Sequence, residues 1–476
     1  MRRPAHALAA STLGIALAAL GTGARAADPP APTWASDVAP ILMGHCVGCH
    51  RPGQVAPFSL LTYADAAKRS RFLARTTHAR VMPPWSPDGP EAAFVDERRL
   101  GDDDVATLDR WAAGGAPPGD LSKAPAPPVA GDEGWHLGPP DVVVRMLRPY
   151  SVPAGPGDTY HVFPIPFSLA GVPADVTARA RIPDTDILAV AAVEIHAGNR
   201  RSLHHADVFI DTKGAARKRE AAEGGNGYDS FGTPGFVPDA YLGGRVPGMT
   251  PRFLPPGIAA GVMPLAGDLA LQIHYSATGR VETDQTEVGI YFMRGPVKRI
   301  MDTLYLRSFR LDIPAGDSRF VVEDSIVVPA DCILMSVFPH MHLIAREVHA
   351  GATLPDGTER PLLDISRWSF RWQDKYFYRE PFILPKGTRV HCRWVFDNSE
   401  ANKANPFSPP RDIRFGPNST DEMCEFQLGL IPVNLGDESL LLDARVRKMR
   451  EKIAELTPEQ RGRFRWSDAF NDLSGR

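Results

Sequence analysis

The chain has 476 residues, of which 43% are hydrophobic and 23% are charged, and its formal net charge at pH 7 is −3. This length is enough for about three ordinary domains, so one domain is too few. The charge is close to neutral, and no block of lysine or arginine is present that could neutralise a phosphate backbone. We therefore expect no nucleic-acid partner.

The N-terminus has the features of a secretory signal. Arg2 and Arg3 precede an apolar stretch from Leu8 to Leu20, and an A-x-A triplet follows at 24–26. This pattern predicts a cleaved signal peptide over 1–26 and a periplasmic or secreted protein. The alternative is a membrane anchor, but the apolar stretch is short, and no later segment approaches the roughly 18 apolar residues of a membrane span.

The next region, 27–120, is predicted to be a small, mostly α-helical unit. Between Asp103 and Ala113, for example, Val105, Leu108 and Trp111 fall on one face of a helix. The stretch 121–140 is crowded with proline and alanine, which suits a linker between domains.

A short motif in the helical unit carries chemistry. Cys46 and Cys49 are three residues apart, and His50 follows directly. Two such cysteines can each add to a haem vinyl group while the histidine ligates the iron, so the motif predicts covalently bound haem c. The alternative is a redox dithiol, but a dithiol does not need the histidine.

The second axial ligand of this haem is expected later in the same unit. Met82 lies in the segment 80–85, RVMPPW, where two prolines would hold the loop rigid. His78 is a rival ligand that would lower the reduction potential. The unit resembles class I-like bacterial cytochrome c domains that end in an MPPW loop.

Beyond the linker, the sequence has the texture of antiparallel sheets. Short β-branched runs such as Ile187 to Ile195, Leu269 to Tyr275 and Arg389 to Phe396 alternate with Gly, Pro, Asp and Asn. We divide this region into two β units, 141–310 and 311–435, followed by a helical tail over 436–476. The expected fold class is multidomain, with a small all-α cytochrome c domain followed by two all-β, antiparallel, jelly-roll-like sandwiches.

Histidines in the first β unit form a recognisable group. His204 and His205 are adjacent, and His274 lies in the segment 271–275, LQIHY. Adjacent residues on a strand point to opposite faces. The pair can therefore share an ion only at a bulge or strand end, or through different ring nitrogens.

The second β unit has a different group. His340 and His342 are two residues apart, so they share one face of a strand and can bind one metal ion without distorting the backbone. Met423 lies in the segment TDEMCEF. A lone histidine on a strand is usually structural, but the combination of groups predicts metal binding.

Together these residues resemble the copper type II, ascorbate-dependent monooxygenases, the family of peptidylglycine α-hydroxylating and dopamine β-monooxygenases, over roughly 139–433. The resemblance implies two copper ions. The first would be held by an adjacent histidine pair and a QxHY histidine, and the second by an HxH pair and a DEMC methionine. The implied ligands are His204, His205 and His274 for the first ion, and His340, His342 and Met423 for the second.

The resemblance also implies a function, namely an exported monooxygenase that hydroxylates a C–H bond with dioxygen. The copper at His340, His342 and Met423 would activate dioxygen, because a thioether favours Cu(I), and the other copper would deliver an electron. The fused haem would supply electrons to the copper centres. The expected partners are dioxygen, an unidentified small-molecule substrate, and an external donor that is either a redox protein or an ascorbate-like reductant.

Three positions depart from the peptide-hydroxylating member of the family. Phe338 stands where that enzyme has the arginine that grips the substrate carboxylate, and Glu425 and Gln427 stand where it has Asn and Tyr. A peptide ending in glycine is therefore a poor guess for the substrate, and an apolar or neutral small molecule is weakly preferred.

The remaining cysteines fit the same layout. The resemblance implies a disulfide between Cys392 and Cys424, whereas Cys332 lies in an apolar run and is expected to be a buried thiol. Two other functions stay open. One is a non-catalytic haem and copper protein for electron transfer or copper binding. The other is a haem protein attached to a carbohydrate- or partner-binding sandwich without copper.

Overall fold

The structure is a computed structural model that describes residues 31–52, 56–89, 93–126, 134–155, 157–246 and 249–463. The predicted signal peptide and part of the predicted linker lie outside these residues. Within them, no helix combines the length and the apolar character needed to cross a membrane.

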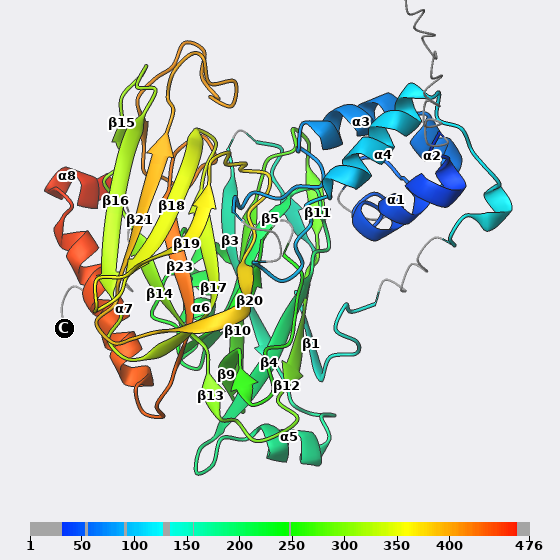
Figure 1. Ribbon diagram of the computed structural model, residues 1–476. Coiled ribbons are helices and arrows are strands. Elements are labelled where there is room, and N and C mark those ends of the chain that lie inside the picture. The colour runs from blue at the N-terminus through cyan, green and yellow to red at the C-terminus, as the bar shows by residue number, and fades with distance from the viewer. Residues whose placement is uncertain are drawn as a thin grey trace, which may run out of the picture.

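The N-terminal region consists of short helices that lie to one side of the sheets (Figure 1). Trp34, Leu42, Leu108 and Trp111 are buried in a small core that these helices share. The elements are a π-helix (Trp34–Val38), α1 (Ala39–His45), α2 (Tyr63–Ala67), α3 (Ser70–His78), α4 (Asp102–Ala113) and a 3-10 turn (Leu121–Lys123).

The first β body has two sheets around one core, which includes Val190, Val208 and Leu271. One sheet has the order β1 (Val142–Arg145), β12 (Glu287–Phe292), β4 (Ile187–His196), β9 (Gly261–Pro264), and the other β6 (Tyr228–Asp229), β3 (Thr159–Phe167), β10 (Gly267–Tyr275), β5 (Leu203–Asp211), β7 (Ala240–Arg245). Smaller elements are the pair β2 (Tyr150–Val152) and β11 (Glu282–Asp284), the pair β8 (Ile258–Ala259) and β13 (Arg299–Ile300), and the helices α5 (Ala174–Ala180) and α6 (Ala215–Glu223).

The second β body is built in the same way around Trp394, Phe396 and Phe426. One sheet has the order β14 (Asp302–Arg307), β23 (Cys424–Pro432), β17 (Cys332–Met341), β20 (Tyr376–Leu384), and the other β16 (Phe320–Val327), β21 (Arg389–Phe396), β18 (Ala345–Thr353), β19 (Glu359–Ile365). A short pair joins β15 (Asp312–Ile313) to β22 (Ile413–Arg414).

This arrangement corrects the expected fold class. Of the described residues, 34% are in strands and 19% in helices, the strands form several antiparallel sheets, and no separate all-α cytochrome domain stands at the N-terminus. The physical reason lies in the segment 81–100, whose described residues form no helix and contact the second β body. Val95 N–H donates a hydrogen bond of 2.8 Å to Phe377 O, and Phe94 is buried in the core of the second β body.

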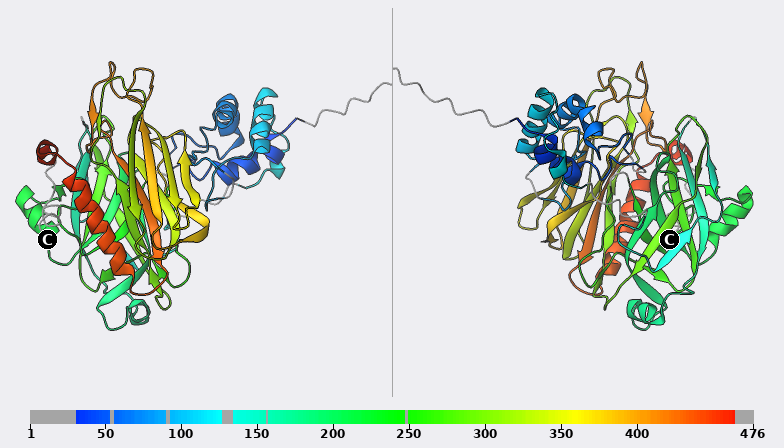
Figure 2. Two further views of the ribbon diagram at one scale, coloured as in Figure 1. Left: turned by 60° about the vertical axis from the view of Figure 1, so that its left-hand side comes forward. Right: turned by 90° about the vertical axis from the view of Figure 1, so that its right-hand side faces the viewer.

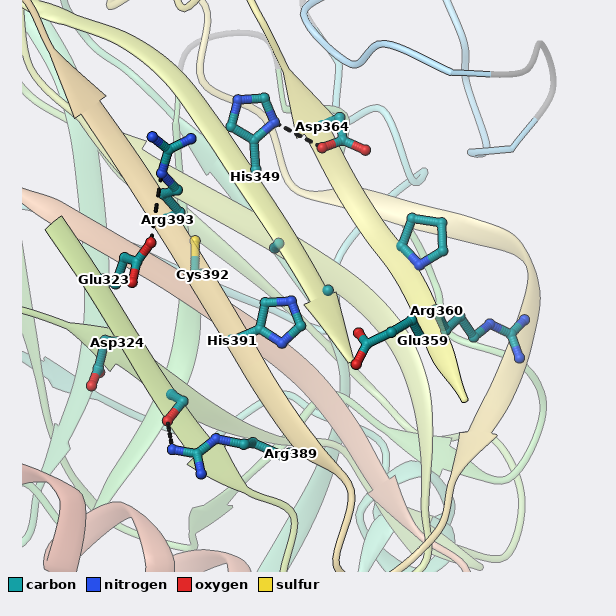
Figure 3. Close-up of a pocket in the computed structure, with 14 residues that line it drawn as sticks. Glu323, Asp324, His349, Glu359, Arg360, Asp364, Arg389, His391, Cys392 and Arg393 are labelled. Atoms are coloured by element: carbon teal, nitrogen blue, oxygen red, sulfur yellow. Dashed lines mark hydrogen bonds and ion pairs between the residues drawn. The ribbon is translucent and has the colours of Figure 1, made fainter. Parts of the chain in front are cut away.

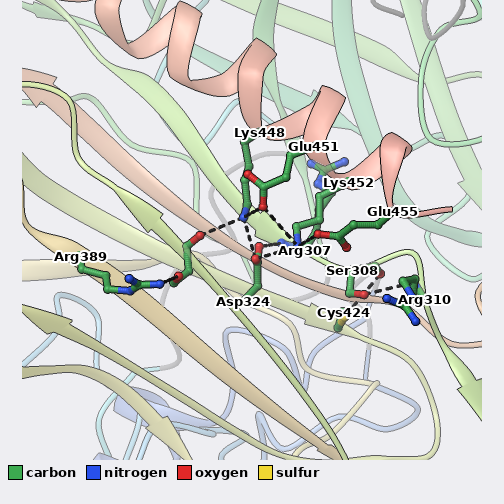
Figure 4. Close-up of polar contacts among 11 residues, drawn as sticks. Arg307, Ser308, Arg310, Asp324, Arg389, Cys424, Lys448, Glu451, Lys452 and Glu455 are labelled. Atoms are coloured by element: carbon green, nitrogen blue, oxygen red, sulfur yellow. Dashed lines mark hydrogen bonds and ion pairs between the residues drawn. The ribbon is translucent and has the colours of Figure 1, made fainter.

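The C-terminal helix α7 (Glu438–Ala454) packs along the second β body, and α8 (Pro458–Arg463) follows it (Figure 2). Lys448 and Lys452 are buried, and their Nζ atoms lie 2.7 and 2.9 Å from one carboxylate oxygen of buried Asp324 (Figure 4). Apolar side chains such as Leu441 are therefore only part of the contact. The helix also depends on a buried charge cluster, in which removal of one partner would leave uncompensated charge.

The structure also corrects the expected disulfide, because Cys392 and Cys424 are both free thiols. Cys392 lies on β21 and Cys424 begins β23, in the two facing sheets of the second body, and Cys424 Sγ donates to Ser308 O at 3.6 Å instead. Cys332 is fully buried, as predicted.

Candidate metal centre

Three histidines converge at the end of the β5–β10 pair. His205 pairs with His274 in the ladder, but the next pair is Leu203 with Tyr275, so His204 is the extra residue of a bulge. The bulge lets the side chains of His204 and His205 point toward the same place, although adjacent residues of a regular strand point to opposite faces. His205 Nδ1 lies 3.3 Å from His204 Nδ1 and 3.1 Å from His274 Nδ1. In the part of the chain that the structure describes, this is the one group of three that could hold a metal ion through His, Cys, Asp or Glu ligands.

Burial keeps the rings of His204 and His205 neutral. It lowers the pKa of His204 to about 3, with smaller effects from positive charge on His274 and His340. Burial likewise holds the pKa of His205 well below its usual value. A neutral imidazole has one nitrogen lone pair free for a metal ion, so the three facing Nδ1 atoms form a site that suits a cation.

Asp158 orients the third histidine. Its Oδ2 lies 3.1 Å from His274 Nε2, and the Ser419 N–H donates to the same oxygen at 2.9 Å. Burial raises the pKa of Asp158, but its contacts with His274 and Ser419 outweigh burial and hold the pKa well below the usual range. A carboxylate at Nε2 favours the tautomer whose Nδ1 is free to bind a metal ion. The sequence gives no sign that Asp158 has this role, because its contacts come from distant parts of the chain, and Ser419 lies 261 positions away.

The second histidine pair presents the opposite ring nitrogens. His340 Nδ1 lies 2.6 Å from Gln373 Oε1, and His342 Nδ1 lies 3.2 Å from Asp421 O. Because both partners are acceptors, each Nδ1 carries the proton and each Nε2 is left free. His342 Nε2 is buried without any hydrogen-bond partner, which is the condition expected of an atom that takes a metal ion.

Glu422 fixes the backbone around this second pair. Its buried carboxylate accepts hydrogen bonds from the N–H groups of His342 and Ile344, both at 2.9 Å, and of Met423 at 3.1 Å. Burial raises the pKa of Glu422 to about 8, although these hydrogen bonds act against the rise. One side chain thus links the end of β17 to the residue before β23. In the sequence, only the position of Glu422 directly before Met423 pointed to a role near the metal ligands.

The two groups lie against each other. The ring centroids of His205 and His340 are 6.3 Å apart. Phe370 stacks on His204 at 4.7 Å and meets the ring of His342 edge to face at 5.7 Å. The structure therefore brings both predicted histidine groups to one place, where Phe370 bridges them.

A hollow of about 190 Å³ opens beside the two groups, and Met423 lines it together with His205 and His340. Its walls combine aromatic and charged side chains: Tyr160, Asp207, Phe231, Tyr241, Arg245, Phe338, Lys375, Glu425 and Gln427. A larger hollow of about 790 Å³ lies over the sheet of β16, β21, β18 and β19 (Figure 3). None of the predicted metal ligands lines that second hollow, and its His349 is already bonded to Asp364 at 2.8 Å.

The predicted haem attachment residues lie just after α1. Cys46 and Cys49 are half-buried free thiols, and burial, followed by the neighbouring Cys49, raises the pKa of Cys46 to about 12. His50 Nδ1 lies 3.1 Å from Phe58 O, so this nitrogen donates and Nε2 is left for a ligand. Cys46, Cys49 and His50 are therefore compatible with a covalent haem that has His50 as an axial ligand.

The two candidates for the second axial ligand differ in their contacts. The Met82 side chain is exposed and has no polar group to satisfy. His78 Nδ1 is bonded to Asp109 Oδ2 at 2.9 Å. Met82 is thus free of such a bond, whereas His78 already has a carboxylate partner.

The fold and the site together define a mostly antiparallel β protein with a group of three histidines that could hold a metal ion. No protein-family model matches the chain, and no curated protein sequence matches it. A two-domain protein of unknown function from Bacteroides fragilis is 10% identical, with 57% of this chain and 94% of that chain covered and a TM-score of 0.15. The VP2 subviral particle of infectious bursal disease virus is 8% identical, with 61% and 71% covered and a TM-score of 0.19. Likenesses this weak carry no argument.

Proposed function

We propose that this protein is an exported dicopper monooxygenase that hydroxylates a C–H bond with dioxygen and receives electrons through a covalently attached haem. Bound copper would supply the one-electron chemistry that dioxygen activation requires. The observation that supports this proposal most is that the six predicted ligands, from four separate parts of the chain, gather in one region, where His205, His340 and Met423 line one hollow.

The first copper would be held by Nδ1 of His204, His205 and His274. An all-imidazole set suits both Cu(I) and Cu(II), so this site can store an electron and release it. Asp158 holds the ring of His274 in place from the far side, at 3.1 Å.

The second copper would be held by Nε2 of His340 and His342 and by the thioether of Met423. The softer sulfur favours Cu(I), the state that reacts with dioxygen. Met423 and His340 line the hollow, where Phe231 and Phe338 provide apolar surface against which the carbon atoms of a substrate would pack.

The N-terminal segment contacts the part of the chain that supports the second site. The rings of Trp85 and Tyr376 meet edge to face at 5.4 Å, and the Arg98 guanidinium lies 4.7 Å from the Trp372 ring. Trp372 precedes Gln373, the hydrogen-bond partner of His340. The haem would thus be tethered in the same chain as the proposed copper sites, which would raise the effective concentration of the electron donor.

Elemental analysis tests the proposal. Protein that is exported to the periplasm should contain one iron and two coppers per chain. His274→Ala and His342→Ala should each lower the copper content without changing the iron content. Protein without copper would exclude the proposal. Protein that contains copper but takes up dioxygen no faster with any substrate would instead be an electron-transfer or copper-binding protein.

A further inference from the structure

The hollow beside the proposed copper ligands contains two positive side chains without partners. Lys375 and Arg245 both line it. Among the described residues, no carboxylate lies within ion-pair distance of either side chain, and neither side chain has a hydrogen-bond acceptor. Arg200 adds a further positive charge near Arg245.

The acids of the same hollow are already satisfied. Asp207 Oδ1 accepts a hydrogen bond from Tyr241 Oη at 2.8 Å. Glu425 forms an ion pair of 2.7 Å with Arg307 and accepts a hydrogen bond of 2.6 Å from Gln427. Glu425 is thus matched by a cation and Asp207 is held by a hydroxyl, whereas no carboxylate contacts Lys375 or Arg245.

Lys375 is half-buried, and a cation that is partly removed from water without a partner lowers the stability of the fold. Burial lowers the pKa of Lys375 to about 8, and no nearby acid opposes this effect. The nearest recorded contact of its ammonium group is the ring of Phe377, 5.7 Å from the nitrogen. No group of the protein pairs with this charge, so a bound anion would explain why a cation is kept at this position.

We infer that the hollow binds a small organic acid, whose carboxylate pairs with Lys375 while its carbon skeleton lies against Phe231 and Phe338, and that Arg245 adds positive charge to the same hollow. This inference deepens the proposed function, because the C–H bonds of such a ligand would lie beside His340 and Met423. It also replaces the weak sequence-based preference for a neutral substrate. Only the oxidation of the ligand depends on copper, whereas its binding depends on Lys375.

Calorimetric titration of the full-length protein, freed of copper, separates binding from catalysis. The probes are two carboxylates, acetate and benzoate, each compared with its neutral amide, acetamide or benzamide. At least one carboxylate should bind roughly tenfold more tightly than its amide, because an ammonium–carboxylate pair is a charge-assisted contact. Failure of the protein to bind copper would not affect this result.

Variants then locate the contact. Lys375→Met should weaken binding of the carboxylate about tenfold and leave binding of the amide unchanged, whereas Lys375→Arg should retain most of the affinity. Arg245→Gln should weaken carboxylate binding by a smaller factor. The control is Lys403→Met, which changes an exposed lysine. The inference is wrong if neither carboxylate binds more tightly than its amide, or if Lys375→Met and Lys403→Met bind it equally.

Discussion

The two histidine groups lie side by side but are supported in different ways. His204, His205 and His274 lie inside one sheet, and a bulge in the β5–β10 ladder turns them toward each other. His340 and His342 lie at the end of β17, where Glu422 and Gln373 hold them by hydrogen bonds. The first group is thus shaped mainly by backbone register and the second by buried side chains. A single side-chain change should therefore damage the second group more.

The largest effect is expected from Glu422. Glu422→Leu removes the acceptor of three buried N–H groups, and each unsatisfied group costs about 1–3 kcal/mol, so the free energy of unfolding should fall by several kcal/mol. Glu422→Gln keeps one acceptor oxygen and should lose less. Urea denaturation measures the difference. Copper analysis should show that the His340 site loses copper more readily than the His204 site. Equal loss of copper from both sites would show that Glu422 does not support the second group specifically.

The matching change in the first group is Asp158→Asn. An asparagine can still contact Ser419 but lacks the charge that orients His274. Loss of such a carboxylate typically weakens metal binding about 10–100-fold. Competition with a copper chelator should show this loss for one of two coppers. An equal decrease at the His340 site would mean that the two groups are not supported independently.

Lys375 contrasts with Asp158, because its charge has no partner. The pKa of Lys375 in the folded protein, about 8, lies below its ordinary value of 10.5. At pH 7 both folded and unfolded chains are protonated, so the folded protein bears the cost of the buried charge. Between about pH 8 and pH 10.5 the folded chain has released this proton and the unfolded chain has not, so the cost disappears as the pH rises.

Lys375→Met should therefore raise the stability of the ligand-free protein at pH 7 by on the order of 1–2 kcal/mol, a value discounted for partial exposure of the side chain. The gain should vanish above about pH 10.5. Thermal melts over this pH range, with Lys403→Met as control, measure it. A stability gain that does not change with pH would point to better packing as the cause.

The smallest effect is expected at Phe370, which touches both groups. Phe370→Leu keeps an apolar side chain but removes the stack on His204 and the edge contact with His342, a loss of about 0.5–1.5 kcal/mol. If the ring holds both groups in place, the paramagnetic resonance spectra of both coppers should change. A change confined to one copper would show that Phe370 supports only that group.

The N-terminal region shows where prediction from sequence failed. The helix near 103–113 is present as α4, with Val105, Leu108 and Trp111 buried as its periodicity predicts. The prediction of a separate all-α domain is wrong, because the segment 81–100 joins β20 and places Phe94 in another core. A proline-rich segment has no helical or strand periodicity of hydrophobic residues, so its sequence does not show which sheet it packs against.

What the sequence by itself determined about this protein is local. Side-chain alternation placed His340 and His342 on one face. The adjacency of His204 and His205 called for a bulge, a strand end or different ring nitrogens, because both patterns depend on the backbone geometry of a few neighbouring residues. Only the tertiary structure decided that Asp158 meets His274, that Phe370 lies between the two groups, and that Lys375 lines the hollow without a partner. These contacts join residues far apart in the chain, so they depend on how the two β bodies pack, which no local pattern records.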